Sequence, residues 1–160
     1  MCVVATNTGQ NPPSAAPILV RVTGGRTNPA TLVVTPNTSL VFQNDDPFPH
    51  RLVVVGQTNW NGVMDPHAKR EWKAPGGAGR IEFRDELFPS VRSFVVVDPH
   101  AVQSVYPAHD NSFGLALPAG DFVIKVFFGG KQVGKDVGVT AKEKGTLEIK
   151  DAIALAEGQK

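Results

Sequence analysis

The residues of this chain best suited to chemistry are its 4 histidines. His50 follows an Asn-Asp-Asp-Pro turn and begins an apolar run in the stretch "QNDDPFPHRLVVV". An imidazole at the rigid start of a strand can bind a transition metal, and an imidazole beside a carboxylate can bind zinc or copper(II). His67, His100 and His109 each lie in a turn near an aspartate. A metal site would need some of these residues as partners of His50.

The spacing of the histidines matches no paired-ligand motif. If a metal binds, we expect it at His50 together with His67 or Met64. Alternatively, the His50 imidazole closes the Asp-Asp-Pro turn and hydrogen-bonds backbone groups at the start of a strand. We favour this structural role and expect no metal cofactor.

Motifs of common enzymes are missing from the sequence. No serine lies in a Gly-x-Ser-x-Gly elbow, and there is no His-Glu-x-x-His segment. Asp85 and Glu86 are adjacent, so an extended chain would point their carboxylates in opposite directions. We therefore expect a protein without enzymatic activity.

Short apolar runs separated by turn residues predict an all-β fold. The 13 prolines and 16 glycines are too many for a helical protein. Apolar residues alternate with polar ones in "ILVRVTG" and form continuous short runs in "RLVVVG" and "SFVVVD", and both patterns are typical of strands. Further along, "SFGLALPAGDFVIKVFFGGK" predicts a strand, a Pro-Ala-Gly turn and a longer strand.

These patterns divide the chain into four parts. We expect a flexible, polar tether over residues 1–16, a β-sandwich over 17–98, a smaller β module over 99–150 and a tail over 151–160. The 16 basic and 15 acidic residues are interspersed and leave a net charge of +1, which argues against a nucleic-acid partner. No apolar run approaches the length of about 18 residues that a membrane span needs.

The segment "TLVVTPNTSLVFQNDDPFPHRLVVV" resembles the first half of a cupredoxin domain, in which the histidine after this turn is the first copper ligand. "GRIEFRDELFPSVRSFVVVD" resembles the second half, where a Cys-x-x-His-x-x-Met type loop follows a strand. "NSFGLALPAGDFVIKVFFGGK" resembles the hairpin of carboxypeptidase-regulatory-like, transthyretin-like modules. Methylamine-utilisation-like secreted bacterial proteins combine the two in this order. The resemblance implies a cupredoxin-like Greek-key β-sandwich with an appended small β-sandwich or hairpin module.

Three of the four copper ligands of that family are missing from this chain, and His50 is the one retained. A blue-copper site needs a thiolate, two imidazoles and a weak axial ligand. By this resemblance Arg84 takes the place of the thiolate, Phe88 that of the second imidazole, and the axial methionine position falls near Val91. We interpret the blue-copper site as lost. Copper binding or electron transfer through His50 with unorthodox ligands is the alternative.

A sandwich without its cofactor is expected to act as a binding or assembly module in the bacterial periplasm, at the outer membrane or outside the cell. The partner would be an envelope or extracellular protein, or surface glycan. A third possibility is an enzyme or carbohydrate-binding module that works through Trp60 and Trp72, which would need both rings exposed side by side. The predicted binding surface is the end of the sandwich that carries Pro47, Phe48, Pro49, Asp85, Glu86, Leu87, Phe88 and Arg92. Alternatively, Phe48, Leu87 and Phe88 fill the space left by the copper ligands.

Cys2 is the single cysteine, so it makes no internal disulfide. Followed by "VVATNTGQNPPSAAP", it resembles the mature start of a bacterial lipoprotein, whose cysteine is acylated. This would be the only contact with a membrane. An incidental cysteine in a frayed terminus is the other interpretation.

Overall fold

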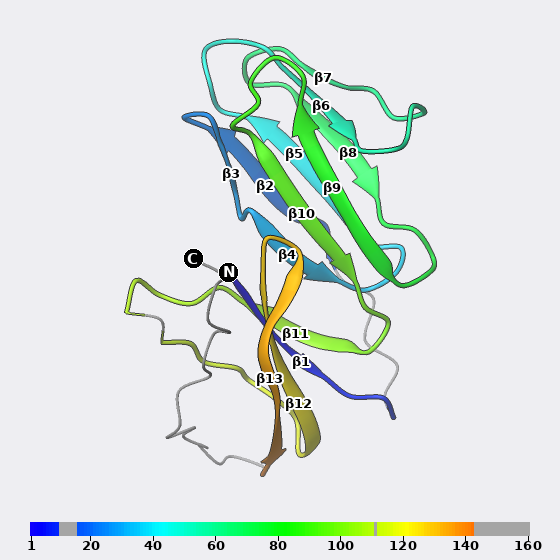
Figure 1. The fold of residues 1–160 in the computed structure, drawn as a ribbon, viewed down its shortest axis with the longest axis vertical. Helices are drawn as coiled ribbons and strands as arrows, with labels where there is room; N and C mark the ends of the chain where they lie inside the picture. The colour runs from blue at the N-terminus through cyan, green and yellow to red at the C-terminus, as the bar shows by residue number, and fades with distance from the viewer. Residues whose placement is uncertain (10–15, 111, 143–160) are drawn as a thin grey trace.

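The structure is a computed structural model that describes residues 1–9, 16–110 and 112–142, and every regular element in these residues is a strand (Figure 1). The all-β prediction is confirmed. No helix in the described part of the chain is long and apolar enough to cross a membrane. In chain order the strands are β1 (Cys2–Thr6), β2 (Ile18–Thr23), β3 (Arg26–Asn28), β4 (Thr31–Val34), β5 (Ser39–Asn44), β6 (His50–Val54), β7 (Gly62–Met64), β8 (Lys69–Lys73), β9 (Gly79–Asp85), β10 (Arg92–Val97), β11 (Ala101–Val105), β12 (Gly120–Phe128) and β13 (Lys131–Ala141).

Strands β2 to β10 form a sandwich. One sheet has the order β4-β10-β9-β6-β7 and the other β3-β2-β5-β8. Alternation along β5 turns Leu40, Phe42 and Asn44 inward, while the residues between them are half-buried. Phe42 and Phe83 pack with ring centroids 4.9 Å apart at the centre of the core between the sheets. The β-sandwich prediction is confirmed.

The remaining strands form a second body, a single sheet of order β11-β1-β12-β13 that lies below the sandwich in Figure 1. One face of this sheet carries a separate apolar cluster that includes Val3, Phe122 and Ile124. Phe113, Leu115 and Leu117 pack against the same cluster from a segment without strand pairing. The expected hairpin is therefore shifted: β12 pairs with β13 through Gly129 and Gly130, and the segment before the Pro-Ala-Gly turn covers the sheet instead.

The prediction of a flexible tether is wrong for the first residues of the chain. Cys2–Thr6 is strand β1, which pairs with β11 on one side and β12 on the other. All five of its residues are buried, because Val3 and Ala5 face one apolar cluster and Cys2 and Val4 the other. A run buried on both faces lacks the polar alternation that identifies a half-exposed strand. Residues 10–15 of the expected tether lie outside the described residues.

Strand β4 joins the two bodies, and it too is buried on both faces. Leu32 and Val34 enter the sandwich core, whereas Val33 packs with Cys2 and Phe127 of the second body. The turn between β12 and β13 adds polar contacts, since the Gly129 amide donates to Thr31 Oγ1 at 3.1 Å and Arg80 Nη2 donates to the Gly129 carbonyl at 3.1 Å. The sandwich thus occupies Ile18 to Val97, and the second body combines β1 with residues from Ala101 onward. The end of the predicted 99–150 module and the 151–160 tail lie outside the described residues.

Candidate functional site

His50 lies at the first residue of β6 and is fully buried at one end of the sandwich. Both of its ring nitrogens face carboxylates. Nε2 lies 2.8 Å from Asp46 Oδ2, and Nδ1 makes a short hydrogen bond with Asp85 Oδ2. Both aspartates are themselves buried. The side chain therefore bridges two acidic groups, rather than bonding to backbone groups as the sequence suggested.

The loop before β6 builds the Asp46 side of this arrangement. Asn44 Oδ1 accepts a hydrogen bond from the Asp46 amide at 2.9 Å, and its Nδ2 donates to the Phe48 and Met64 carbonyls. Asp46 Oδ1 in turn accepts from the Gly24 amide at 2.7 Å, at the turn between β2 and β3. The Asn-Asp-Asp-Pro turn is thus tied to two other loops, which places Asp46 beneath His50.

The other carboxylate comes from the end of β9. Asp85 Oδ1 accepts hydrogen bonds from the backbone amides of Arg51 at 3.2 Å and Leu87 at 2.8 Å, with Phe88 at 3.3 Å. Its second oxygen, Oδ2, is directed at His50. Asp85 therefore closes the loop that follows it and holds the imidazole at the same time.

The charge state of the three groups follows from their hydrogen-bonding capacity. An ionised carboxylate only accepts, so the imidazolium form of His50, which donates from both nitrogens, satisfies both aspartates. Burial opposes ionisation of Asp46. The amide of Gly24 and the imidazole of His50 outweigh it and hold the pKa of Asp46 below its ordinary value. We call Asp46, His50 and Asp85 the buried triad.

Two aromatic rings cover the buried triad from the outside. The Phe88 ring lies 5.0 Å from the His50 ring and 4.8 Å from Phe48, and Phe48 lies 5.3 Å from His50. Both phenyl rings are half-buried. They keep water from the imidazole, so no substrate reaches it in this conformation.

Asp85, Phe88 and Val91 have the spacing of the Cys-x-x-His-x-x-Met loop named in the sequence resemblance. Asp85 and Phe88 contact His50, and Val91 is buried in the core of the sandwich. Arg84, which the resemblance puts at the thiolate position, does not contact His50. Arg84 is exposed and faces away from His50, since successive residues of a strand point to opposite faces. A carboxylate bound to imidazole, a phenyl ring and an isopropyl group do not fit a blue-copper centre.

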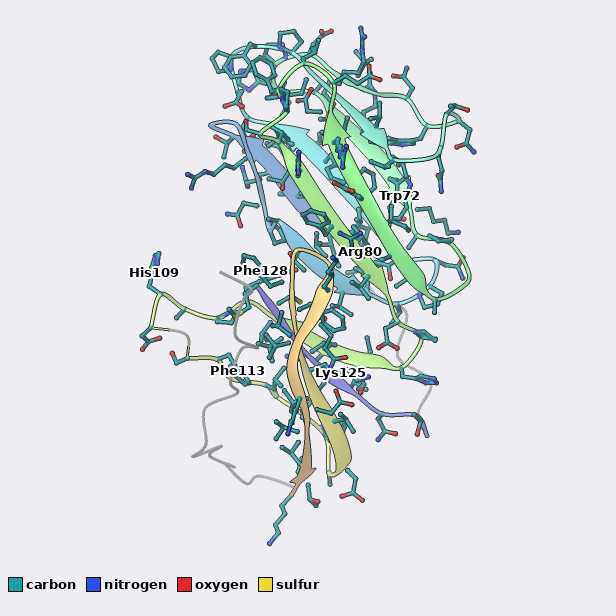
Figure 2. The ribbon with its side chains drawn as sticks, viewed as in Figure 1. Trp72, Arg80, His109, Phe113, Lys125 and Phe128 are labelled. Atoms are coloured by element: carbon teal, nitrogen blue, oxygen red, sulfur yellow. The ribbon has the colours of Figure 1, made fainter. Side chains whose placement is uncertain are left out.

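The alternative ligand set is only partly assembled. Met64 pairs with His50 across β6 and β7 and is fully buried. His67 is exposed and near Asp45, outside the triad. His100, between β10 and β11, is also exposed. So is His109, which lies in a loop of the second body (Figure 2). Among the described residues, no group of three or more His, Cys, Asp or Glu side chains is arranged to hold a metal.

Most residues of the predicted binding surface lie on neighbouring loops at one end of the sandwich. Contact between the Phe48 and Phe88 rings places the 45–49 loop against the 86–90 loop, and Ser90 Oγ donates to the Gly25 carbonyl of a third loop. Pro47, Pro49, Glu86, Leu87 and Arg92 are exposed, with Leu87 at 46%. Asp85 does not belong to this surface, because its hydrogen bonds hold it inside. We call the exposed residues of the 45–49 and 86–90 loops the loop end.

Cys2 is unsuited to lipid attachment in this fold. Cys2 is fully buried and packs with Val4, Val33 and Phe127 between the two bodies. Burial raises the pKa of the Cys2 thiol, with hydrogen bonds at Val33 and Ser104 opposing the shift. An acyl chain on Sγ would disrupt this contact, so the predicted anchor conflicts with the packing of β1.

Neither tryptophan forms an exposed platform for sugar rings. Trp72 is buried against Phe83, with ring centroids 5.0 Å apart, and Trp60 packs on Phe42 at 5.9 Å. Trp60 Nε1 donates to the Glu71 carbonyl at 2.9 Å. Trp72 belongs to the core and Trp60 is partly buried against it, so the two rings do not lie exposed side by side as glycan binding through both would require.

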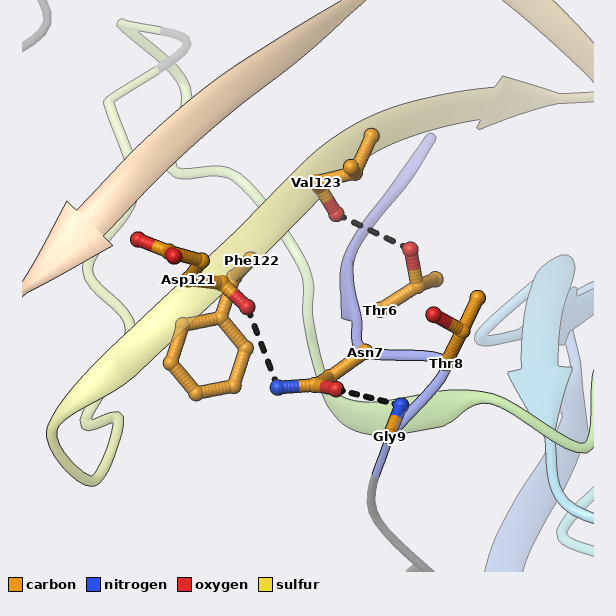
Figure 3. Close-up of a pocket in the computed structure, with 7 residues that line it drawn as sticks. All are labelled: Thr6, Asn7, Thr8, Gly9, Asp121, Phe122 and Val123. Carbon is orange, nitrogen blue, oxygen red and sulfur yellow. Dashed lines mark hydrogen bonds between the residues drawn. The ribbon is translucent and has the colours of Figure 1, made fainter.

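A hollow in the second body is lined by residues 6–9 and 121–123 (Figure 3). Its polar groups bond to one another. Asn7 Nδ2 donates to the Asp121 carbonyl at 3.0 Å, and Thr6 Oγ1 donates to the Val123 carbonyl at 3.2 Å. The Asp121 carboxylate accepts from Thr140 at 2.7 Å. The hollow therefore offers no cluster of reactive side chains.

No protein-family model and no curated protein matches this chain. Solved structures of amicyanin variants are similar to part of it: one in the Cu(I) form has a TM-score of 0.47 and 21% identity, and covers 59% of this chain and 99% of its own. A copper-containing nitrite reductase from Thermus scotoductus has a TM-score of 0.45 and 19% identity, covering 52% of this chain and 22% of its own. These similarities cover only part of the chain.

Proposed function

We propose that this protein is a non-enzymatic binding module that docks onto another protein through its loop end. The observation that supports the proposal is the occupation of both His50 nitrogens by buried carboxylates. In a copper centre a ring nitrogen of this residue would have to face the metal instead. With Phe48 and Phe88 over the triad, what remains accessible at this end is an apolar rim of Pro47, Pro49 and Leu87. Exposed apolar residues that cluster on one end are typical of a contact surface.

By the sequence resemblance, we place the partner among proteins of the bacterial envelope or the extracellular space. The residues that contact the partner would be the exposed ones of the loop end. The hydrogen bonds of the buried triad hold the loops that carry them in place. The opposing function is copper binding through His50 and Met64, favoured by their burial side by side.

Copper titration, followed by visible absorption and electron paramagnetic resonance, separates the two functions. We expect only weak binding of the kind that exposed histidines give, and it should decrease in His67→Ala but not in His50→Gln. One tightly bound equivalent that is lost in His50→Gln or Met64→Leu would overturn the proposal.

Docking itself is tested with a photo-crosslinking amino acid in place of Leu87. In cells of the source organism we expect one defined protein to be crosslinked at this position, and a Pro49→Asp substitution should abolish the product. The same probe in place of Val55, which is exposed at 48% elsewhere on the sandwich, is the control. Equal products from both positions would contradict docking through the loop end.

A further inference from the structure

A row of arginines crosses the outward face of the sheet β4-β10-β9-β6-β7. Arg92 of β10 and Arg84 of β9 are directly opposite in register, and Arg84 is opposite Val53 of β6. All three point outward, because the residues that alternate with them, such as Ser93 and Phe83, are buried. Arg51 lies two residues from Val53 and shares this face. We call Arg51, Arg84 and Arg92 the arginine row.

Positive charge on this row exceeds the negative charge beside it. Glu82 accepts from Arg84 Nε at 2.9 Å, and Arg51 lies 3.5 Å from Glu86. A hydrogen bond from Arg84 lowers the pKa of Glu82, with burial opposing and the neighbouring arginines, Arg92 among them, adding to the effect. Three arginines beside two glutamates leave an excess of positive charge on this face, although the net charge of the chain is only +1. Arg84 and Arg92 lie directly opposite each other, and like charges in this position destabilise a sheet.

The uncovered part of this face adjoins the loop end. At the other end of the sheet, the second body covers Val33 and Val96, and its β12–β13 turn contacts Arg80. Figure 2 shows Arg80 close to that turn. The Glu86 amide donates to the Arg51 carbonyl at 2.9 Å, which places the arginine row beside Leu87. One continuous surface thus combines an apolar rim with guanidinium groups.

We propose that the arginine row binds the acidic segment of a protein partner, an inference that rests on the proposed function of the loop end. Guanidinium groups bind carboxylates in a bidentate manner, and arginine is enriched in protein interfaces whereas lysine is depleted. The ion pairs to Glu82 and Glu86 are solvent-exposed on their arginine side, so carboxylates of a partner can replace them at low cost. Val53 between the arginines adds apolar contact area.

Fluorescence anisotropy with a labelled oligoglutamate peptide tests the row. We expect binding at low ionic strength that weakens with added salt. The double substitution Arg84→Glu and Arg92→Glu should weaken it roughly ten-fold or more. Because this variant can fail to fold, the neutral pair Arg84→Gln and Arg92→Gln is measured as well and should also lose affinity.

Lys69→Glu with Lys73→Glu, on exposed positions of β8 in the other sheet, is the matched control for net charge. A similar loss in this control, or no binding of the peptide by the unmodified protein, overturns the inference. So does binding of heparin or phosphatidylserine vesicles through the arginine row without binding of the peptide.

The two proposals fail separately. Pro49→Asp should leave peptide binding within about two-fold, because it lies outside the row. If peptide binding depends on the row but the Leu87 crosslink does not occur, the proposed docking at the loop end is wrong and the arginine row still binds acidic chains. If the crosslink occurs and the peptide does not bind, only the inference about the row fails.

Discussion

His50 is held between two buried carboxylates, so its removal leaves both of them without a counter-charge. We expect His50→Ala to lower the free energy of unfolding by about 3–5 kcal/mol, the range found when one partner of a buried ion pair is deleted. Urea denaturation gives this quantity. His67→Ala, at an exposed turn, is the control and should change it by less than about 0.5 kcal/mol. An equally small loss in His50→Ala would show that the triad is not ionised.

The lowered pKa of Asp46 predicts how stability depends on pH. Its ionised form is favoured in the folded protein, so its contribution is present above the ordinary carboxyl pKa and is lost as pH falls through the lower value of the folded state. Asp46→Asn should therefore destabilise the protein at neutral pH, and the difference from the unmodified protein should narrow in acid. Urea denaturation at a series of pH values checks this. A difference that stays constant between about pH 7 and pH 3 would contradict the assignment.

At the scale of single elements, β1 is the strand on which the second sheet depends, because it separates β11 from β12. Removing residues 1–6 should unfold this sheet and leave the sandwich folded, since the sandwich has a core of its own. Limited proteolysis would then cut β12 and β13 while β2 to β10 stay resistant.

A synthetic peptide of residues 1–7 supplies the control for this deletion. Added to the shortened protein, it should restore resistance to proteolysis, whereas a peptide with Val3 and Ala5 replaced by aspartate should not. Unchanged proteolysis after the deletion would mean that β1 is dispensable.

Strands with regular alternation could be predicted from the sequence, and strands buried on both faces could not. Apolar and polar residues alternate along β2 and β5, so their faces follow from the pattern. "CVVAT" is short, lies next to polar residues and has no periodicity, and only contacts with β11 and β12 make it a strand. The spacing of Asp85, Phe88 and Val91 did carry a signal for the triad. Contact between Asp85 and His50 joins residues far apart in the chain, and the sequence does not show it.

At the scale of the whole molecule, the turn between β12 and β13 should be sensitive to a single methyl group. A Cβ at Gly130 would lie 2.7 Å from Arg80 Nε and 2.9 Å from Phe94 Cβ, whereas a Cβ at Gly129 would meet nothing within 4 Å. The φ angle is positive at both glycines, 75° at Gly130 and 58° at Gly129, so alanine strains the backbone by a similar amount at either position. We expect Gly130→Ala to lower the free energy of unfolding by roughly 1–3 kcal/mol more than Gly129→Ala. Equal values from chemical denaturation would contradict close packing of this turn on the sandwich.

The position of β1 has a consequence for the order in which the protein can be made. Its five residues leave the ribosome before the sandwich does, but β11 and β12, between which they lie, are synthesised only after the whole sandwich. Until then this uncharged, apolar segment has no strand of its own chain with which to pair. Nascent chains that carry this segment are therefore exposed to aggregation throughout elongation, and a chaperone that binds short apolar stretches would protect them.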